Sequence, residues 1–135
     1  MHTDGMLTVE EPFVLRTCAD GVATLTLNRP ERFNPLSSQM IAALHAELTA
    51  IADEPSIGVV ILAAEGKGFC AGHDLKEMRT HTDDKGWQRR LFDTCSRMMM
   101  ALTEMPQPVI ARVHGIATAA GCQLLSMCDL AVAHR

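Results

Sequence analysis

The sequence predicts an α/β fold with parallel strand pairing, and two observations lead to this expectation. Short apolar runs typical of strands alternate along the chain with longer segments of helical periodicity. Two of the apolar runs are also followed by a glycine-containing loop and then by the start of a helix. The resulting order, strand–strand–helix–strand–helix–strand–helix–strand, favours a parallel sheet with right-handed crossovers.

The first two strands of this order are expected to form a β-hairpin. Two runs in which apolar and polar residues alternate, 13–17 and 22–28, flank an Asp-Gly pair at 20–21. An Asp-Gly pair between alternating runs is a strong signal for a hairpin turn. The segment 30–35 begins and ends with proline, so we expect a loop after the hairpin.

A helix and a buried strand are expected next. Ser37 or Ser38 can cap the helix, and Pro55 ends it. Residues 57–63 are continuously apolar, which predicts a strand buried on both faces. The apolar residues that recur at helical spacing are Met40, Ile41, Leu44, Leu48 and Ile51.

The second half of the chain continues the alternation of helices and strands. A polar, exposed loop is expected at 79–86, followed by a helix at 87–105 that two prolines end. A short buried strand at 109–113 precedes a helix at about 118–127. The last strand, 130–133, has the pattern of a central strand, yet no covering helix follows it, which indicates a truncated architecture.

The length of 135 residues fits one domain. We expect residues 13–135 to form this domain and residues 1–12 to be a flexible N-terminus. The net charge of −4 argues against a nucleic-acid partner. No apolar stretch approaches the roughly 18 residues of a membrane-spanning helix, so no membrane partner is expected. The polar, acidic N-terminus resembles neither a signal peptide nor a transit peptide, which favours a cytoplasmic location.

The five cysteines are odd in number and lack the spacing of a metal site. We therefore expect free, buried thiols in a reducing compartment, without a nucleophilic role. The sequence contains no HExxH pattern and no carboxylate–histidine cluster, so no metal is expected. The cysteines are Cys18, Cys70, Cys95, Cys122 and Cys128.

Two segments share one design, in which a buried strand leads through a glycine-containing loop into a helix. They are VVILAAEGKGFCAGHDLKEM at 59–78 and VIARVHGIATAAGCQLLSM at 109–127. Helix N-termini carry unpaired N–H groups, and two such turns facing each other could donate two hydrogen bonds to one developing oxyanion. The alternative is that the glycines only make turns and tight packing. Neither segment contains a P-loop or a dinucleotide-binding pattern.

Three blocks of the sequence resemble motifs of one family. GKGFCAGHDLKEM is similar to G-x-x-F-x-A-G-x-D-[LI]-x-E-[ML] of the enoyl-CoA hydratase/isomerase (crotonase) superfamily. HGIATAAGCQLLSMCDLAVA is similar to N-G-x-A-x-G-G-G-x-E-L-x-x-x-C-D-x-x-[VI]-A, and LNRPERFNPLS to L-N-R-P-x-x-x-N-[AP]-L-[ST] of that family. The blocks occur in the family's order, and the resemblance covers essentially all of residues 13–135.

The resemblance implies a ClpP/crotonase-like spiral of β-β-α units, of which this chain would be the N-terminal part. It also implies a homo-oligomer, a trimer or hexamer in relatives, and an acyl-CoA substrate. Coenzyme A would enter as part of the substrate, so no separate cofactor is expected. By motif position, the backbone N–H groups of His73 and Ala120, the latter beside Gly121, would hold the thioester oxygen in an oxyanion hole.

The same resemblance implies a set of substrate-binding positions, where cations would meet the CoA phosphates. Lys76 and Arg32 could equally be solvated cations, and Asp74 fits a helix N-cap better than a general base. The expected CoA-binding residues are Arg32, Phe33, Ala71, Gly72, Asp74, Leu75 and Lys76.

One departure from the family pattern bears on the reaction. Relatives that hydrate enoyl-CoA use two Glu carboxylates, and the first of these positions is Gln123 here. The second would lie beyond Arg135. An amide cannot accept and return a proton at neutral pH, so Gln123 argues against efficient hydration. Isomerisation or another reaction through a thioester enolate stays open. The alternatives are a catalytically silent acyl-CoA-binding or interaction protein, or an inactive fragment.

Overall fold

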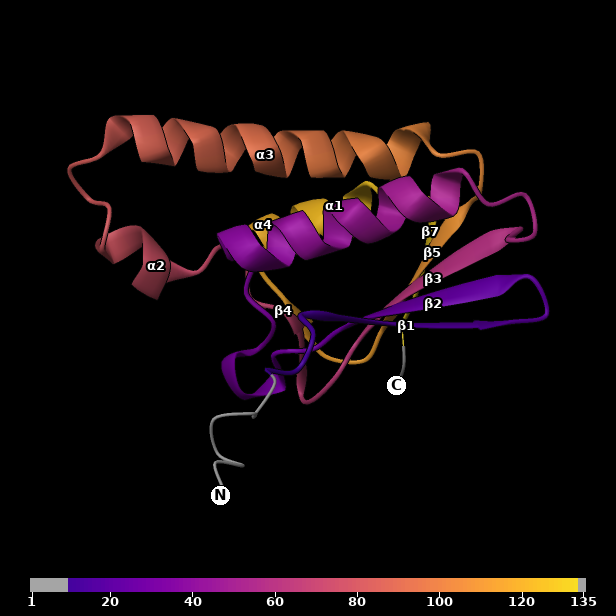
Figure 1. Cartoon of the computed structure of the whole chain (residues 1–135). Coiled ribbons are helices and arrows are strands. Elements are labelled where there is room, and N and C mark those ends of the chain that lie inside the picture. Colours follow the sequence, from indigo (N-terminus) through magenta and orange to yellow (C-terminus); the bar gives the residue numbers. More distant parts are fainter. Residues whose placement is uncertain (1–9, 134–135) are drawn as a thin grey trace, which may run out of the picture.

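The computed structural model describes residues 10–133 and consists of a five-stranded sheet with helices stacked on one side (Figure 1). Most of the expected flexible segment 1–12 lies outside the described residues. In chain order the elements are β1 (Val14–Ala19), β2 (Val22–Leu27), the 3₁₀ helix η2 (Pro30–Arg32), α1 (Ser38–Ala52), β3 (Val59–Ala64), β4 (Gly68–Cys70), α2 (Leu75–Arg79), α3 (Lys85–Glu104), β5 (Val109–Val113), β6 (Ile116–Ala117), α4 (Ala120–Ser126) and β7 (Leu130–Ala133).

The main sheet has the strand order β1-β2-β3-β5-β7. The hairpin strands β1 and β2 pair antiparallel, and every other neighbouring pair is parallel. The turn between β1 and β2 places both Asp20 and Gly21 at positive φ, as an Asp-Gly hairpin turn requires. The predicted α/β class, hairpin and parallel pairing are therefore confirmed.

Helix α1 packs between the sheet and α3 (Figure 1). Its N-cap is Ser37, whose hydroxyl oxygen accepts a hydrogen bond from the Met40 N–H at 3.1 Å. All five apolar residues expected on its inner face are buried. They meet the alternating buried residues of β2, namely Ala23, Leu25 and Leu27.

Two predictions about strand burial are wrong. Strand β3 was expected to be buried on both faces, but Val59 and Ile61 are only half-buried while Val60 and Leu62 are fully buried. Strand β7 was expected to be central, yet it lies at the sheet edge with all four residues exposed. The alternation in β3 arises because the described helices α1 and α3 stack on only one side of the sheet. Strand β7 is exposed because, among the described residues, it pairs only with β5 and has no neighbour at its other edge.

The polar segment at 79–86 is exposed as expected, but it is more regular than a loop. Helix α2 ends at Arg79, and α3 already begins at Lys85, capped by the Asp84 carboxylate, which accepts from the Trp87 N–H at 2.9 Å. The His81 imidazole stacks on the Trp87 indole, with ring centroids 3.8 Å apart and planes 6° from parallel. The connection between the two helices is therefore held by its own side chains.

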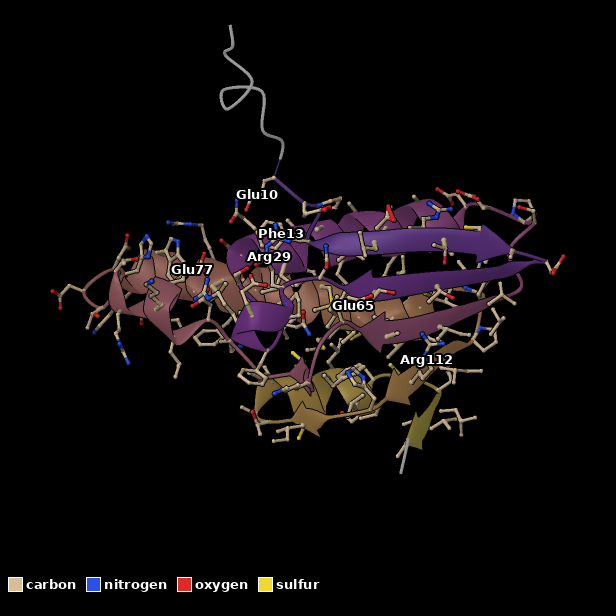
Figure 2. The ribbon with its side chains drawn as sticks, turned by 90° about the horizontal axis from the view of Figure 1, so that it is seen from below. Glu10, Phe13, Arg29, Glu65, Glu77 and Arg112 are labelled. Atoms are coloured by element: carbon tan, nitrogen blue, oxygen red, sulfur yellow. The ribbon has the colours of Figure 1, made fainter. Side chains whose placement is uncertain are left out.

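The first described residues are tied to the loop after β2. Arg29 donates to the Glu11 carbonyl at 2.6 Å and forms an ion pair with Glu10 at 3.2 Å. Its guanidinium also lies 3.7 Å from the centre of the Phe13 ring, and these side chains gather at one end of the hairpin (Figure 2).

A second, two-stranded sheet was not predicted from the sequence. Strands β4 and β6 pair in parallel, with Gly68 opposite Ile116 and Cys70 opposite Ala117. These strands are three and two residues long, too short for a periodic pattern. The small sheet is functionally important because it holds the two glycine-containing loops next to each other. Within the described chain, no helix has the length and apolar character needed to cross a membrane.

Candidate active site

The two loops meet at Gly72. Its φ of +89° lies in the left-handed region that favours glycine. A Cβ atom at this position would lie 3.1 Å from the Thr118 carbonyl oxygen and 3.4 Å from the Ala120 nitrogen. A side chain here would therefore press on the turn that opens α4. The sequence left open whether the two turns face each other, and this approach shows that they lie against each other.

Main-chain and side-chain hydrogen bonds fix the two loops together. The Thr118 N–H donates to the Cys70 carbonyl at 3.1 Å, and the Thr118 hydroxyl donates to the Ala71 carbonyl at 3.2 Å. Gly121 packs so closely that a Cβ atom there would overlap the Cys70 carbonyl oxygen. The position of α4 is thus set by the backbone of the first loop.

Other main-chain groups of the first loop are bonded in this framework. The Ala71 N–H donates to the Phe33 carbonyl at 2.9 Å, and the Leu36 N–H donates to the Gly72 carbonyl at 2.6 Å. By contrast, the N–H groups of His73 and Ala120 have no acceptor among the described residues. The two amides named by the motif positions are therefore available to a ligand.

The turn before α4 carries a strained residue. Ala119 has φ 51° and ψ −121°, a backbone conformation that a residue with a Cβ atom rarely adopts. It directly precedes Ala120, the first residue of α4, which is buried. Unusual backbone angles of this kind cluster at ligand sites, where the surrounding structure holds them in place.

Asp74 contacts two of the other predicted CoA-binding residues, Arg32 and Lys76. Its carboxylate caps α2 by accepting from the N–H groups of Lys76 at 3.0 Å and Glu77 at 3.2 Å, so its expected role as an N-cap is confirmed. The same oxygen pairs with the Arg32 guanidinium at 2.8 Å. The Arg32 side chain is nevertheless 46% exposed. In the described part of the chain, the exposed Lys76 forms no ion pair.

The apolar members of the predicted set are exposed. Phe33 is 48% exposed and Leu75 is 66% exposed. Phe33 adopts a positive φ of 61° at the end of η2, and its ring fills the space where a side chain at residue 68 would stand. Large exposed apolar side chains beside the cations Arg32 and Lys76 are compatible with a ligand that has both an aromatic base and phosphates.

The side chain of His73 lies against α3. Its imidazole meets the Phe92 ring edge to face, with centroids 5.3 Å apart and an angle of 83° between the planes. Its Nδ1 atom is buried and has no hydrogen-bond partner among the described residues. Gln123 lies one turn into α4, is exposed, and its side-chain amide forms no hydrogen bond within the described part of the chain.

The cysteines divide into two groups. Burial raises the pKa of Cys70 to about 11, and burial with the nearby Asp129 charge raises that of Cys128 to about 11. These thiols stay protonated at neutral pH and are poor nucleophiles. The prediction that all thiols are buried is wrong for Cys18 and Cys122, which are exposed. Among residues 10–133 no group of His, Cys, Asp and Glu could hold a metal ion.

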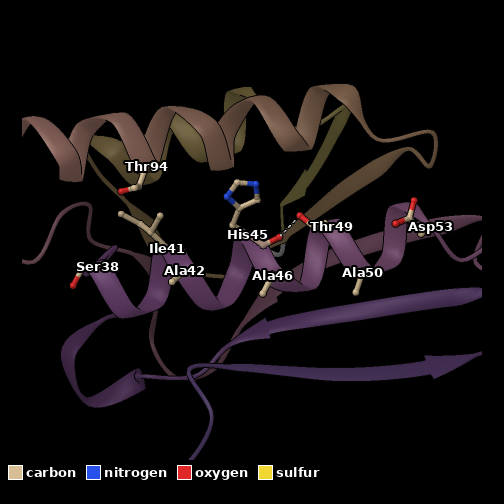
Figure 3. A pocket seen from close by; sticks show the side chains of 9 residues that line it. All are labelled: Ser38, Ile41, Ala42, His45, Ala46, Thr49, Ala50, Asp53 and Thr94. Atoms are coloured by element: carbon tan, nitrogen blue, oxygen red, sulfur yellow. Dashed lines mark hydrogen bonds between the residues drawn. The ribbon is translucent and has the colours of Figure 1, made fainter.

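A groove of about 700 Å³ lies elsewhere, along the outer side of α1 beneath α3 (Figure 3). Alanines four residues apart on α1 leave the groove open, and none of its lining residues belongs to the two loops. The groove is therefore separate from the place where the loops meet. Its lining residues are Ser38, Ile41, Ala42, His45, Ala46, Thr49, Ala50, Asp53 and Thr94.

Sequence reasoning missed two residues that build the site. Asn34, which is fully buried at a positive φ of 51°, accepts from the Arg29 N–H and donates to the carbonyls of Glu65 and Gly68. Thr118 supplies the hydroxyl bond to the first loop. An Asn before a proline in a tight loop was the available signal for Asn34, since Asn tolerates left-handed backbone angles.

Comparison with known proteins decides the family. The model of the family described as enoyl-CoA hydratase/isomerase matches residues 17–135, which is most of the chain. The chain belongs to the enoyl-CoA hydratase/isomerase family. The chain is 44% identical over 113 residues to the zebrafish (Danio rerio) "Enoyl-CoA hydratase domain-containing protein 3, mitochondrial", covering 84% of this chain and 39% of that protein. It is also 36% identical over 127 residues to the Escherichia coli "1,2-epoxyphenylacetyl-CoA isomerase", covering 91% of this chain and 48% of the relative.

A solved structure extends this match to three dimensions. The crystal structure of an enoyl-CoA hydratase from Mycobacterium smegmatis superposes with a TM-score of 0.88 and 56% sequence identity. The superposition covers 91% of this chain and 48% of that one. The predicted crotonase-like α/β fold is therefore confirmed, and this chain of the enoyl-CoA hydratase/isomerase family spans less than half the length of these relatives.

Proposed function

We propose that this enoyl-CoA hydratase/isomerase family protein acts on an acyl-CoA thioester, whose carbonyl oxygen accepts hydrogen bonds from the His73 and Ala120 N–H groups. The observation that carries the proposal is the approach of Gly72 to the Ala120 nitrogen, together with two amides that have no acceptor within residues 10–133. Two donors aimed at one oxygen stabilise the negative charge that develops when a thioester becomes an enolate.

The CoA moiety would bind along α2 and η2. Lys76 and Arg32 offer positive charge for its phosphates, and Ala71 is exposed at the edge of the first loop, where the adenine end would lie. Phe33 and Leu75 add exposed apolar surface. In this arrangement Asp74 positions both cations, because its carboxylate caps α2, which carries Lys76, and pairs with the Arg32 guanidinium.

The chemistry we propose is a lyase or isomerase reaction that proceeds through a thioester enolate, with inefficient hydration. Gln123 can orient a water molecule but cannot exchange a proton with it at neutral pH. The E. coli relative that is named as an isomerase is compatible with family chemistry other than hydration.

The proposal is tested by binding and turnover measured on the same preparation. Butyryl-CoA is expected to bind in a calorimetric titration, and crotonyl-CoA is expected to lose its conjugated thioester absorbance only slowly. The Gln123→Ala variant should hydrate crotonyl-CoA at a rate within about threefold of the wild type, because the amide transfers no proton. Absence of butyryl-CoA binding would contradict the proposed function. Rapid crotonyl-CoA hydration that Gln123→Ala abolishes would contradict the role given to Gln123.

We also propose that the protein associates with further copies of itself. Strand β7 exposes its edge and two large apolar side chains, Leu130 at 57% and Val132 at 53%. An unpaired strand edge of this kind favours pairing with another chain. Sedimentation velocity should give a mass above that of one chain, and a stable monomer at micromolar concentration would refute this proposal.

A further inference from the structure

At the two loops, the His73 imidazole carries a buried polar atom that the described framework leaves without a partner. Its Nδ1 atom is buried and makes no hydrogen bond to any residue in 10–133. Leaving a buried polar atom unpaired costs folding free energy, and buried polar groups in folded proteins are nearly always paired. A residue with only a packing role at this position would avoid that cost by being apolar, so the nitrogen calls for an explanation in function.

Three other ionisable side chains around the loops are already committed. The Asp74 carboxylate accepts two α2 amides and the Arg32 guanidinium. The Glu77 carboxylate accepts from the Ser38 N–H at 3.0 Å and from the Ser38 hydroxyl at 2.6 Å. Burial keeps the Cys70 thiol protonated. The His73 Nδ1 atom, in contrast, has no partner within residues 10–133.

The imidazole packs against an aromatic ring of α3. It contacts the Phe92 ring edge to face, and Phe92 itself is 47% exposed. This contact is apolar, so no hydrogen bond within the described residues fixes which ring nitrogen carries the proton. A neutral imidazole in such a setting has one nitrogen that can accept a proton and one that can donate.

We propose that the His73 imidazole is the base that removes the α-proton of the acyl-CoA, an inference that rests on the proposed function. The backbone N–H of the same residue would hold the thioester oxygen, and the α-carbon is bonded to that carbonyl carbon. In the step, the Cα–H bond breaks and its electron pair forms the C=C bond of the enolate. The carbonyl π pair moves onto oxygen, and the proton goes to the unprotonated imidazole nitrogen, giving an imidazolium. The reverse step returns a proton to carbon. His73 would thus carry out the proton transfer that the Gln123 amide cannot.

The test is exchange of the α-protons of butyryl-CoA for deuterium in D₂O, followed by NMR. This saturated thioester cannot be hydrated, so exchange reports enolate formation alone. His73→Gln keeps the backbone N–H and is expected to slow exchange by about 100-fold or more, while butyryl-CoA affinity in calorimetry stays within about threefold. His73→Ala should lose exchange to a similar extent and regain part of it when free imidazole is added. His81→Gln removes an imidazole from the α2–α3 connection and should exchange like the wild type.

The outcomes separate this inference from the function on which it rests. Exchange by His73→Gln within about threefold of the wild type overturns the inference and leaves the oxyanion site intact. Failure of the wild type to bind butyryl-CoA overturns both. If His73→Gln is misfolded, as shown by loss of the native circular dichroism spectrum, His73→Ala becomes the variant that tests the inference. A folded His73→Ala that binds butyryl-CoA but is not rescued by imidazole counts against the base.

Discussion

Gly72→Ala is expected to remove nearly all acyl-CoA turnover from a protein that still folds. The added methyl group would stand 3.1 Å from the Thr118 oxygen, 3.2 Å from the Ala119 Cβ atom and 3.4 Å from the Ala120 nitrogen. It would therefore fill the space beside the free Ala120 amide. Loss of one oxyanion donor typically lowers kcat by about 10²–10³-fold, so a loss of at least this size in α-proton exchange is expected. The positive φ adds a strain of about 1–2 kcal/mol to the free energy of folding.

A matched variant separates the backbone strain from the loss of the site. Gly21 has a similar φ of +80°, and a Cβ atom there would meet nothing closer than the Ser56 carbonyl oxygen at 3.5 Å. Gly21→Ala should therefore lose about the same stability in urea unfolding while keeping its exchange rate. Gly72→Ala with an exchange rate like that of Gly21→Ala would show that the space beside Ala120 is not the substrate site.

Gly121→Ala is expected to give the largest loss of stability among single-methyl substitutions in α4. The new Cβ atom would overlap the Cys70 carbonyl oxygen, which is held in place by the Thr118 N–H. Since the obstacle is backbone on both sides, α4 must move away from the first loop. Overpacking of this kind costs typically about 1–3 kcal/mol, measured as a lower urea midpoint at an unchanged slope.

The control for this substitution is Gly86→Ala in the first turn of α3. A Cβ atom there would meet only the ends of flexible side chains, Arg90 at 3.4 Å and Asp84 at 3.5 Å. Alanine is the better helix former, so this variant should gain about 0.4–1 kcal/mol. Equal stability of Gly121→Ala and the wild type would mean that the two loops are not in the close contact described above.

Sequence patterns predicted the elements that have a clear hydrophobic period or are bounded by turn-forming residues. The Asp-Gly turn at 20–21 and the five apolar residues of α1 each carry a local signal, and the structure agrees with both. The short pair β4–β6 has no such signal, because two or three residues cannot display a period. The exposure of β7 could not be predicted either, since burial depends on which elements cover a strand and not on its own composition.

The site could be predicted only as far as it is local. The motif positions pointed to His73 and Ala120, and neither of their amides has an acceptor among the described residues. The bonds that make this possible join residues far apart in the chain, such as Asn34 to Gly68 and Thr118 to Ala71. No periodic pattern reports such contacts. The buried, unpartnered Nδ1 of His73 likewise becomes visible only when every neighbour is placed.

The stacked pair in the α2–α3 connection gives the molecule an intrinsic optical reporter. Trp87 is the only tryptophan of the chain, and its indole lies 3.8 Å from the His81 ring. Trp87 lies in the first turn of α3, whose Phe92 contacts His73, and His81 lies in the connection from α2, which Asp74 caps beside the first loop. We expect the emission of this single indole to change when its distance from the His81 ring changes. A ligand that shifts either helix should therefore change the fluorescence emission of Trp87, and no added label is needed to measure it.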